Sequence, residues 1–291
     1  MTQHSGTDWT LVNGDCIDVL GQQPDAIADL SVYSPPFSSL YIYSASERDI
    51  GNCATHEEFL THMGFFIREL LRVTKPGRLT CCHIAQVTST KATHGVIGII
   101  DLRGAMVKAY TDAGWIYHGD ICIDKDPQAQ AIRTHSKALL FVQLRKDASW
   151  LRPALADYIL VFRAPGENQV PVKPDLSNNE WIEWARPIWY GIKETDTLNT
   201  AVAKENDDER HICPLQLGTI ERCIRLWSNP GDLVISPFAG IGSEGYEAVR
   251  LGRKYLGIEL KESYWRTAVK NLQTAETLKH QGELFESSAA R

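Results

Sequence analysis

Residues 233–260, LVISPFAGIGSEGYEAVRLGRKYLGIEL, constrain the fold more than any other stretch of the chain. An apolar run that predicts a buried strand leads into Gly240, Gly242 and Gly245, and a helix pattern and a second apolar run follow. Glycines at this spacing let the backbone turn tightly and let a ligand approach it closely. Glu259 ends the second run, where an acid can bind a ribose diol. The stretch predicts a nucleoside cofactor, and its spacing leaves both a dinucleotide and S-adenosylmethionine open.

The same alternation of strands and helices runs through most of the chain. Apolar runs of strand length occur at 9–13, 28–34, 78–85, 115–124, 157–165, 233–236 and 254–260. The clearest helix follows Thr55, with Glu58 three residues on as a capping partner, and Pro76-Gly77 is expected to end it. Because strands separated by helices pair in parallel, the pattern predicts a doubly wound α/β fold with a mostly parallel sheet.

Residues 165–207 interrupt this pattern. The stretch has little periodicity and is rich in proline and tryptophan, with Trp181, Trp184 and Trp189 close together. We interpret it as an inserted region that carries specificity rather than core. The chain then divides into 1–164, the insert 165–207 and 208–291, and the two flanking parts form one domain.

Ser34-Pro35-Pro36-Phe37 ends a predicted strand in an unusual way. Proline donates no ladder hydrogen bond and pushes the preceding residue out of the helical region. The strand must therefore stop, and the chain must leave it stiff and extended. A simple turn would carry Gly or Asn and would need no aromatic residue after it. The segment is a candidate functional element.

Composition places few limits on function. The net charge of −6 neither demands nor forbids a polyanionic partner, because Lys and Arg can be confined to one cleft. The start of the chain is polar, and no apolar run approaches the roughly 18–20 residues that span a bilayer. We therefore expect a cytoplasmic protein without a membrane partner.

The seven cysteines are scattered and form no C-x-x-C pair, which predicts reduced and mostly buried thiols. Cys81 and Cys82 are adjacent on a predicted strand and should point to its opposite faces. His83 follows them, but no second Cys/His pair stands at zinc-ligand spacing. We expect no metal site.

Taken together, the Ser34–Phe37 segment and Ser236–Gly245 resemble the motifs of DNA amino-methyltransferases. These enzymes transfer a methyl group from S-adenosylmethionine to N4 of cytosine or N6 of adenine. Ser34 to Phe37 match the catalytic motif (D/N/S)-P-P-(Y/F). Ser236 to Ser243 match D-P-F-x-G-x-G-T, with Ser236 in place of the acid and Ser243 in place of threonine. The order of the motifs is similar to that of the permuted beta group, including the methyltransferases that phages and prophages encode.

The resemblance covers roughly 9–164 and 208–275 and implies the seven-stranded α/β sheet of S-adenosylmethionine-dependent methyltransferases, with 165–207 as a variable target-recognition insert. It implies double-stranded DNA as the partner, leaves a homodimer open, and suggests restriction-modification in a bacterial or phage-infected cell. By resemblance, the cofactor-binding residues would be Asp15, Cys16, His211, Pro214, Phe238, Ala239, Gly240, Gly242, Ser243 and Glu259.

The catalytic motif supplies what an exocyclic amine needs. The lone pair of such an amine is delocalised into the ring of the base. Hydrogen-bond acceptors for both amino hydrogens favour a pyramidal nitrogen, whose lone pair can attack a methyl group. The Ser34 hydroxyl and the Pro35 carbonyl, held by Pro36, are the predicted acceptors. Phe37 offers a face on which a flipped base can stack. Serine at the first position favours cytosine over adenine, by family resemblance alone.

Basic and aromatic residues are the candidates for DNA contacts: Lys91, Arg103, Arg133, Lys137, Trp181 and Trp184. Each also has a plainer reading, as a solvated charge or as part of a small apolar core in the insert. An RNA or small-molecule methyltransferase remains a rival, as does a catalytically inactive DNA-binding protein. A dinucleotide-dependent oxidoreductase explains the glycines but not the Ser34–Phe37 segment. The cysteine-dependent route to 5-methylcytosine is set aside because no cysteine follows a proline.

Overall fold

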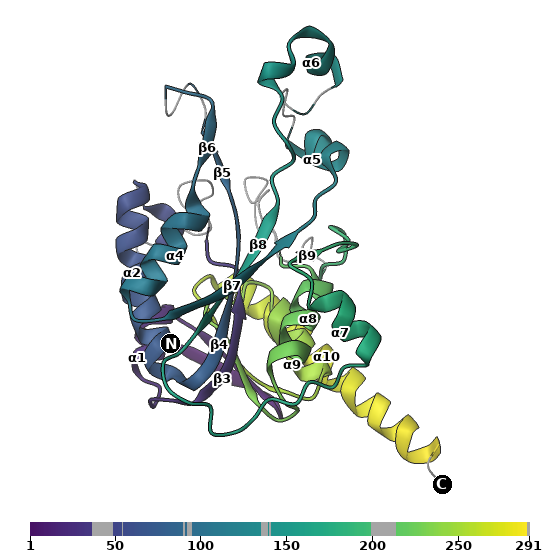
Figure 1. The fold of residues 1–291 in the computed structure, drawn as a ribbon. Coiled ribbons are helices and arrows are strands. Elements are labelled where there is room, and N and C mark those ends of the chain that lie inside the picture. Colours follow the sequence, from purple (N-terminus) through teal and green to yellow (C-terminus); the bar gives the residue numbers. More distant parts are fainter. Residues whose placement is uncertain are drawn as a thin grey trace.

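The structure is a computed structural model of the 291-residue chain and describes residues 1–36, 49–53, 55–89, 91, 95–134, 139, 141–198 and 214–289. One sheet contains nine strands in the order β1-β2-β11-β10-β3-β4-β8-β7-β9 (Figure 1). Its strands are β1 (Thr2–Ser5), β2 (Trp9–Asn13), β3 (Ala28–Tyr33), β4 (Thr74–Ala85), β7 (Ile116–Ile123), β8 (Asp157–Arg163), β9 (Ile188–Trp189), β10 (Leu233–Ser236) and β11 (Lys254–Glu259). A separate hairpin pairs β5 (Val87–Ser89) with β6 (Gly98–Ile100).

The doubly wound, mostly parallel sheet is confirmed. The neighbours β2, β11, β10, β3 and β4 run parallel, while β8 is antiparallel to both β4 and β7. The prediction of seven strands is too low, because two short strands extend the edges. The residues of β1 are exposed and polar, so backbone pairing with β2 rather than an apolar pattern makes this strand. The two-residue strand β9 pairs with β7 and is too short to show the alternation of apolar and polar residues by which a strand is predicted.

Helices cover both faces of the sheet. On one face lie α1 (Cys16–Gly21), α2 (His56–Val73) and α4 (Leu102–Asp112), and on the other lie α8 (Leu217–Trp227), α9 (Ser243–Arg250) and α10 (Glu262–Ala289) (Figure 1). The described residues also form the helices α5 (Pro127–Thr134), α6 (Phe141–Lys146) and α7 (Asn178–Trp184) and the 3-10 turns η1 (Ile50–Asn52) and η3 (Ala148–Trp150). In the part of the chain that the structure describes, no helix is both long and apolar enough to cross a membrane.

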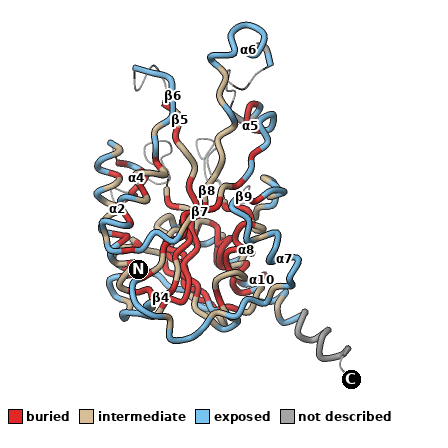
Figure 2. The backbone as a smooth tube through the Cα atoms, viewed as in Figure 1, coloured by how far each residue is buried: buried red, intermediate tan, exposed pale blue. Residues whose placement is uncertain are grey.

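The sheet separates two apolar cores, which appear as the buried interior in Figure 2. Cys82 belongs to the core under α2 and α4, whereas Cys81 belongs to the core under α8, α9 and α10. Both thiols are fully buried and free, as the alternation of side chains along a strand predicts. Thr55 caps α2 as expected, but the helix ends at Val73 because β4 already begins at Thr74.

The stretch predicted as an insert returns to the sheet in its described part, residues 165–198. A capping box between Ser177 and Glu180 starts α7, and Arg225 of α8 pairs with Glu180 at 2.9 Å. Trp189 of β9 is only 1% exposed and lies in the core on the α8 side. The sequence of this segment shows little periodicity because a helix cap, an ion pair and the buried Trp189 hold it against the rest of the protein, rather than one continuous apolar face. Its role in target recognition stays a prediction.

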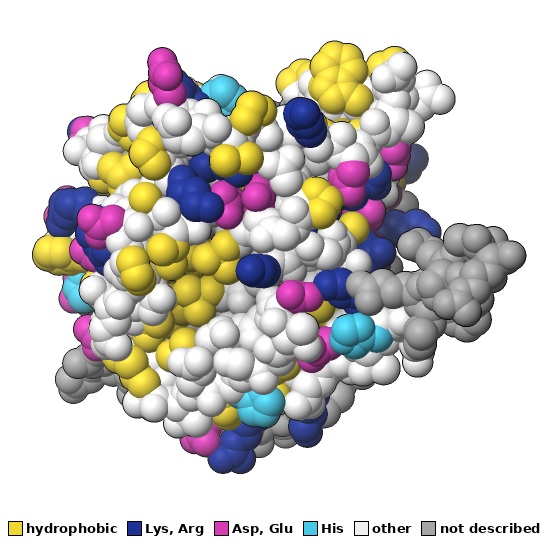
Figure 3. Space-filling model, turned by 90° about the horizontal axis from the view of Figure 1, so that it is seen from below, with side chains coloured by type: hydrophobic (Ala, Val, Ile, Leu, Met, Phe, Trp, Pro, Cys, Tyr) yellow, Lys and Arg dark blue, Asp and Glu magenta, His cyan; other side chains and the backbone are white. Residues whose placement is uncertain are grey.

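The two ends of the sheet differ. At the end where β3 and β10 begin, Arg78 contacts Asp29 and Asp232, each at 3.1 Å. Seen from that end, basic and acidic side chains are interspersed (Figure 3). At the opposite end, where β4 ends, the β5–β6 hairpin and the segment with α5 and α6 project from the body as two arms (Figure 1).

Candidate active site and cofactor pocket

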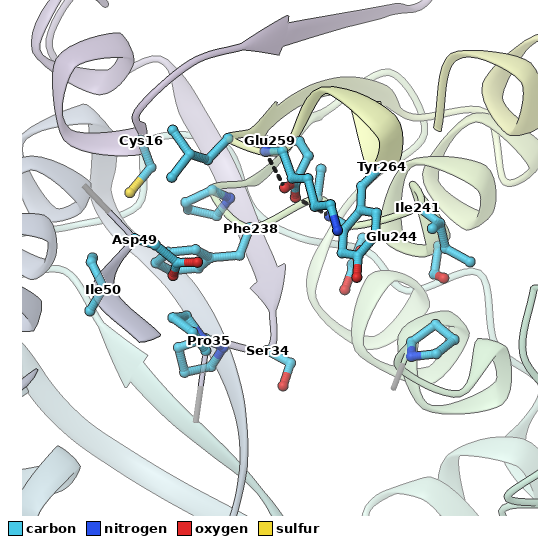
Figure 4. Close-up of a pocket in the computed structure, with 18 of the residues that line it drawn as sticks. Cys16, Ser34, Pro35, Asp49, Ile50, Phe238, Ile241, Glu244, Glu259 and Tyr264 are labelled. Carbon is cyan, nitrogen blue, oxygen red and sulfur yellow. Dashed lines mark hydrogen bonds between the residues drawn. The ribbon is translucent and has the colours of Figure 1, made fainter. Parts of the chain in front are cut away.

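The catalytic motif and the glycine turn meet in one pocket at the carboxyl ends of β3, β10 and β11 (Figure 4). These strands are neighbours in the sheet, although β3 precedes β10 by about 200 residues of sequence. The predicted residues that line the pocket are Asp15, Cys16, Ser34, Pro35, Pro36, Pro214, Phe238, Ala239, Gly240, Ser243 and Glu259. Phe37 and His211 lie outside the described residues, so their predicted roles remain predictions.

The three glycines of the turn have different surroundings. Gly240 lines the pocket with φ of +53°, and a Cβ placed on it would meet no atom within 4 Å. Gly242, with φ of +87°, caps α9 and faces α10, where a Cβ would come 3.0 Å from that of Ala268. A Cβ on Gly245 would lie 2.4 Å from the ring of Tyr255. Gly240 therefore leaves room for a ligand, whereas Gly242 is not among the lining residues and packs against α10, so its predicted contact with the cofactor stays a prediction.

Glu259 connects β11 to the glycine turn. One carboxylate oxygen accepts the N–H of Gly240 at 2.8 Å, and the other accepts that of Lys261 at 2.8 Å (Figure 4). Desolvation raises the pKa of Glu259 to about 7, although the two N–H groups oppose this. Each oxygen keeps a lone pair for a further donor, so the predicted ribose contact is compatible with this geometry.

Glu244 is a pocket residue that the sequence prediction missed. It stands in the first turn of α9, directly after the glycine turn, and is only 4% exposed. Burial raises its pKa to about 8, and the charge of Glu259 acts in the same direction. The signal for it was its place in the first turn of a helix whose N-terminus follows a ligand-binding loop.

We expect Glu244→Gln to make the stability of the ligand-free protein less dependent on pH. A carboxyl whose pKa is raised in the folded state contributes stability at low pH and loses it as pH rises, here between the ordinary value of 4.5 and about 8. Glutamine resembles the neutral carboxyl at every pH. The melting temperature of the variant should exceed that of the wild type by several degrees at about pH 8.5 and match it near about pH 5. Parallel melting curves across this range would contradict the prediction.

Asp15 and Cys16 border the pocket from the start of α1. A carboxylate oxygen of Asp15 accepts the N–H of Ile17 at 2.8 Å and caps the helix. Burial raises the pKa of the Cys16 thiol, with Asp15 adding to the effect, so the thiol stays protonated. Asp15 therefore holds the helix end against the pocket, and its predicted contact with a cofactor base stays a prediction.

Phe238 links the two motifs. Its ring packs against Tyr33, with centroids 5.8 Å apart, and against Phe66 of α2 at 5.0 Å. Tyr33 immediately precedes Ser34, and its side chain is fully buried. The glycine turn and the catalytic motif are therefore positioned by one aromatic cluster. Asp49, Ile50, Lys261 and Tyr264 also line the pocket and were not predicted because they lie outside the motifs, and Ile241 lines it from a variable position of the glycine motif.

Of the predicted DNA contacts, the four whose side chains the structure describes, Lys91, Arg103, Trp181 and Trp184, do not line this pocket. Arg103 pairs with Asp120 and donates to the Tyr117 hydroxyl at 3.3 Å. Trp184 packs under the guanidinium groups of Arg222 and Arg225. Lys91 and Trp181 are exposed, the side chain of Arg133 is not described, and Lys137 lies outside the described residues. The DNA role of all six stays a prediction.

One group of side chains in the described ranges has the composition of a metal site. Single ligand atoms of Cys53, Glu58 and His62 lie within 4.8 Å of one another where α2 begins. Cys53 is buried, His62 is half-buried and Glu58 is exposed. The sequence did not predict this cluster, and the expectation of no metal stays a prediction.

The pocket fits S-adenosylmethionine, the cofactor that the resemblance implies. This molecule carries positive charge on sulfur and on its amino group, and the buried Glu244 and half-buried Glu259 place two carboxyl groups in the pocket wall whose ionised form a bound cation would favour. Gly240 provides open space beside an exposed stretch of backbone.

Comparisons with known proteins agree with this fit. A family model described as DNA methylase, for the N6 and N4 methyltransferases, matches residues 28–270. The type II methyltransferase M.BglI of Bacillus subtilis is 29% identical over 177 residues, which are 60% of this chain and 44% of that protein. The type II methyltransferase M1.MboII of Moraxella bovis is 26% identical over 275 residues, which are 86% of this chain and 91% of that protein.

Solved structures share the fold. TTHA0409 from Thermus thermophilus, solved in complex with S-adenosyl-L-methionine, superposes with a TM-score of 0.68 at 23% identity and covers 91% of this chain and 93% of that one. The cytosine-N4-specific PvuII DNA methyltransferase superposes with a TM-score of 0.65 at 18% identity and covers 94% of this chain and 92% of that one. The matching family model spans both motifs of the pocket, and the chain belongs to the DNA methylase family of N6 and N4 methyltransferases, whose methyl donor is S-adenosyl-L-methionine.

Proposed function

We propose that this protein methylates the exocyclic amino group of a base in double-stranded DNA, with N4 of cytosine as the target. The observation that carries the proposal is the meeting of Ser34 and Pro35 with Gly240 and Glu259 in one pocket. A target amine at the catalytic motif would then face a methyl donor at the glycine turn. The donor, when bound, supplies a methyl group on positively charged sulfur.

The roles of the chain's own residues follow from this arrangement. The Ser34 hydroxyl and the Pro35 carbonyl accept the two amino hydrogens and favour the pyramidal nitrogen. Phe37, which lies outside the described residues, provides the stacking face for a base rotated out of the duplex. The two projecting arms flank the carboxyl edge of the sheet, so we assign them contacts with the DNA on either side of the target (Figure 1).

Cytosine is favoured over adenine by the serine at the first position of the motif. The inactive DNA-binding alternative rested on Ser236, which stands where the family motif has an acid. Ser236 is fully buried and is not among the residues that line the pocket, so this serine itself contributes no group to the pocket wall.

The experiment that tests the function is mass spectrometry of nucleosides from the DNA of cells that express the protein. We expect N4-methylcytosine above the level of cells expressing the Ser34→Ala variant. N6-methyladenine in its place would keep the enzyme class and change the base. No methylated product in cells, together with no label on duplex DNA from labelled S-adenosylmethionine in vitro, would refute the proposal.

A further inference from the structure

A chain of polar side chains runs from Ser34 into the protein. The Ser34 hydroxyl oxygen lies 3.2 Å from Nδ1 of His83. Nε2 of His83 lies 3.2 Å from a carboxylate oxygen of Asp157, and Nζ of Lys125 lies 2.7 Å from the same oxygen. The side chain of His83 is 10% exposed, that of Asp157 15% and that of Lys125 3%. Such a set is costly to bury unless its members act on one another.

Sheet register brings these residues together. In β3 and β4, Tyr33 pairs with Cys82, so Ser34 and His83 follow side by side. In β4 and β8, Ala85 pairs with Asp157, two residues from His83 on the same strand face. The sequence offered His83 only as an incomplete zinc ligand. Its partners come from a different strand and from the segment after β7, and no local pattern joins them.

The charges favour one tautomer of His83. Burial opposes ionisation of Asp157, but contact with His83 and Lys125 outweighs it, and the pKa of Asp157 lies below its usual value. The Asp157 carboxylate therefore favours the tautomer of His83 with the proton on Nε2. The two groups lie at ion-pair distance, although the N–H is not aligned for a hydrogen bond. Nδ1 is then an acceptor, and it faces the Ser34 hydroxyl.

The orientation of the Ser34 hydroxyl follows. Its oxygen has two close partners on His83, Nδ1 at 3.2 Å and the backbone carbonyl at 3.3 Å. Both are acceptors in this tautomer, so the single hydroxyl hydrogen points toward His83 and the oxygen lone pairs are left for the pocket. Because its one hydrogen is used on His83, the Ser34 hydroxyl can act only as an acceptor toward the pocket.

We propose that His83, held by Asp157 and Lys125, is the positioning residue that keeps Ser34 an acceptor for the target amine and then receives the proton that the amine loses. The inference rests on the proposed function. Methyl transfer forms the nitrogen–carbon bond, breaks the carbon–sulfur bond and leaves that electron pair on sulfur, so the nitrogen has one proton to release. This proton passes to the Ser34 oxygen as the hydroxyl proton passes to Nδ1, and Asp157 stabilises the imidazolium.

The relay makes the reaction sensitive to acid. When Nδ1 is protonated before transfer, it donates to Ser34, occupies a lone pair and can take no further proton. Among the described residues, Ser34 after β3 and Asp157 of β8 face the ring of His83. Lys125 after β7 contacts the same Asp157 oxygen and lies 3.8 Å from Glu194. With Asp157 ionised over the tested range, the turnover of the wild type should fall as pH is lowered and His83 gains a proton.

The test uses the full-length protein, labelled S-adenosylmethionine and amplified genomic DNA, which carries no methylation. His83→Leu should lower the single-turnover rate by roughly 10²-fold, the lower end for a positioned acid–base group. His83→Asn keeps an acceptor oxygen near the position of Nδ1 but does not titrate. It should recover part of the rate and show no acidic limb. His118→Asn, on an exposed histidine of β7, is the matched control and should behave as wild type.

Calorimetry separates the relay from the cofactor pocket. His83 does not line that pocket, so both His83 variants should bind S-adenosylmethionine with the affinity of the wild type. A wild-type rate in His83→Leu would overturn the proposal, and so would an acidic limb that persists unchanged in His83→Asn. A loss of rate matched by an equal loss of cofactor affinity would assign His83 a structural role and overturn it as well.

Nitrogen-15 spectra of the histidine rings supply a readout that needs no activity. The His83 signals, identified by their loss in His83→Asn, should show the proton on Nε2 and an acceptor at Nδ1. A proton on Nδ1 at neutral pH would overturn the relay even in a protein that methylates DNA. If the wild-type protein labelled no DNA, the proposed function would be refuted. The nitrogen-15 spectrum would still show which ring nitrogen of His83 carries the proton, and so whether Ser34 is oriented as proposed.

Discussion

Ser34→Ala is expected to lower the rate of methyl transfer by about 10²–10³-fold, the effect of removing one group that stabilises charge in a transition state. The substitution removes the hydroxyl acceptor and leaves Pro35 alone to orient the amine. Because Ser34 borders the pocket from β3, opposite the glycine turn, the affinity for S-adenosylmethionine should change little. The loss should therefore appear in kcat.

Single-turnover kinetics with labelled cofactor and cofactor titration by calorimetry separate these effects. Ser5→Ala is a matched control, since Ser5 is an exposed serine on the edge strand β1 and pairs with Thr10, away from the end of β2 that leads to Asp15 in the pocket. If Ser34→Ala transferred methyl groups at the wild-type rate, the hydroxyl could not be an acceptor for the amine. A loss of cofactor affinity without a loss of rate would show that Ser34 contacts the cofactor rather than the target amine.

Glu259→Ala should weaken cofactor binding by about 1–3 kcal/mol, the cost of leaving hydrogen-bond donors unpaired. The carboxylate accepts the N–H groups of Gly240 and Lys261, so its loss loosens the turn and also removes the acceptor predicted for the ribose. Because the pKa of Glu259 is raised to about 7, the carboxylate that favours a cationic ligand forms as pH rises. Wild-type affinity should increase through that pH, and the increase should be smaller in the variant.

Calorimetric titrations at about pH 6 and about pH 8.5 measure both effects around the raised pKa. Glu167→Ala, at an exposed loop position beyond β8, serves as the control and should retain wild-type affinity at both values. Equal affinity of Glu259→Ala and wild type at the higher pH would show that this carboxylate contributes nothing to the cofactor site.

Much of the fold was predictable because each of its main strands carries a local signal. The apolar runs at 28–34, 233–236 and 254–260 became β3, β10 and β11, and the glycine turn and catalytic motif lie where these strands end. The edge strands were not predictable. The polar β1 and the two-residue β9 exist through backbone pairing with a neighbour, which leaves no period in the sequence.

The part of the site formed by the two motifs was likewise predictable from local sequence signals, whereas other pocket residues were not. The motif residues Ser34 and Gly240 were found because proline and glycine restrict or free the backbone in ways that a sequence shows. Gly242 was assigned to the cofactor by its place in the glycine motif, and its described surroundings, packed against α10, could not be known from that motif. Glu244 was missed because a carboxylate in a first helical turn is common, and only its burial distinguishes it.

By itself, the sequence determined the alternating architecture, the two motifs and the kind of chemistry that they serve, since these depend on backbone freedom and on residue type. Only the tertiary structure decided that β3 lies between β10 and β4. That strand order brings Ser34 to Gly240 on one side and to His83 on the other. The physical reason is that strand order and register follow from packing across the whole sheet, which local spacing does not encode.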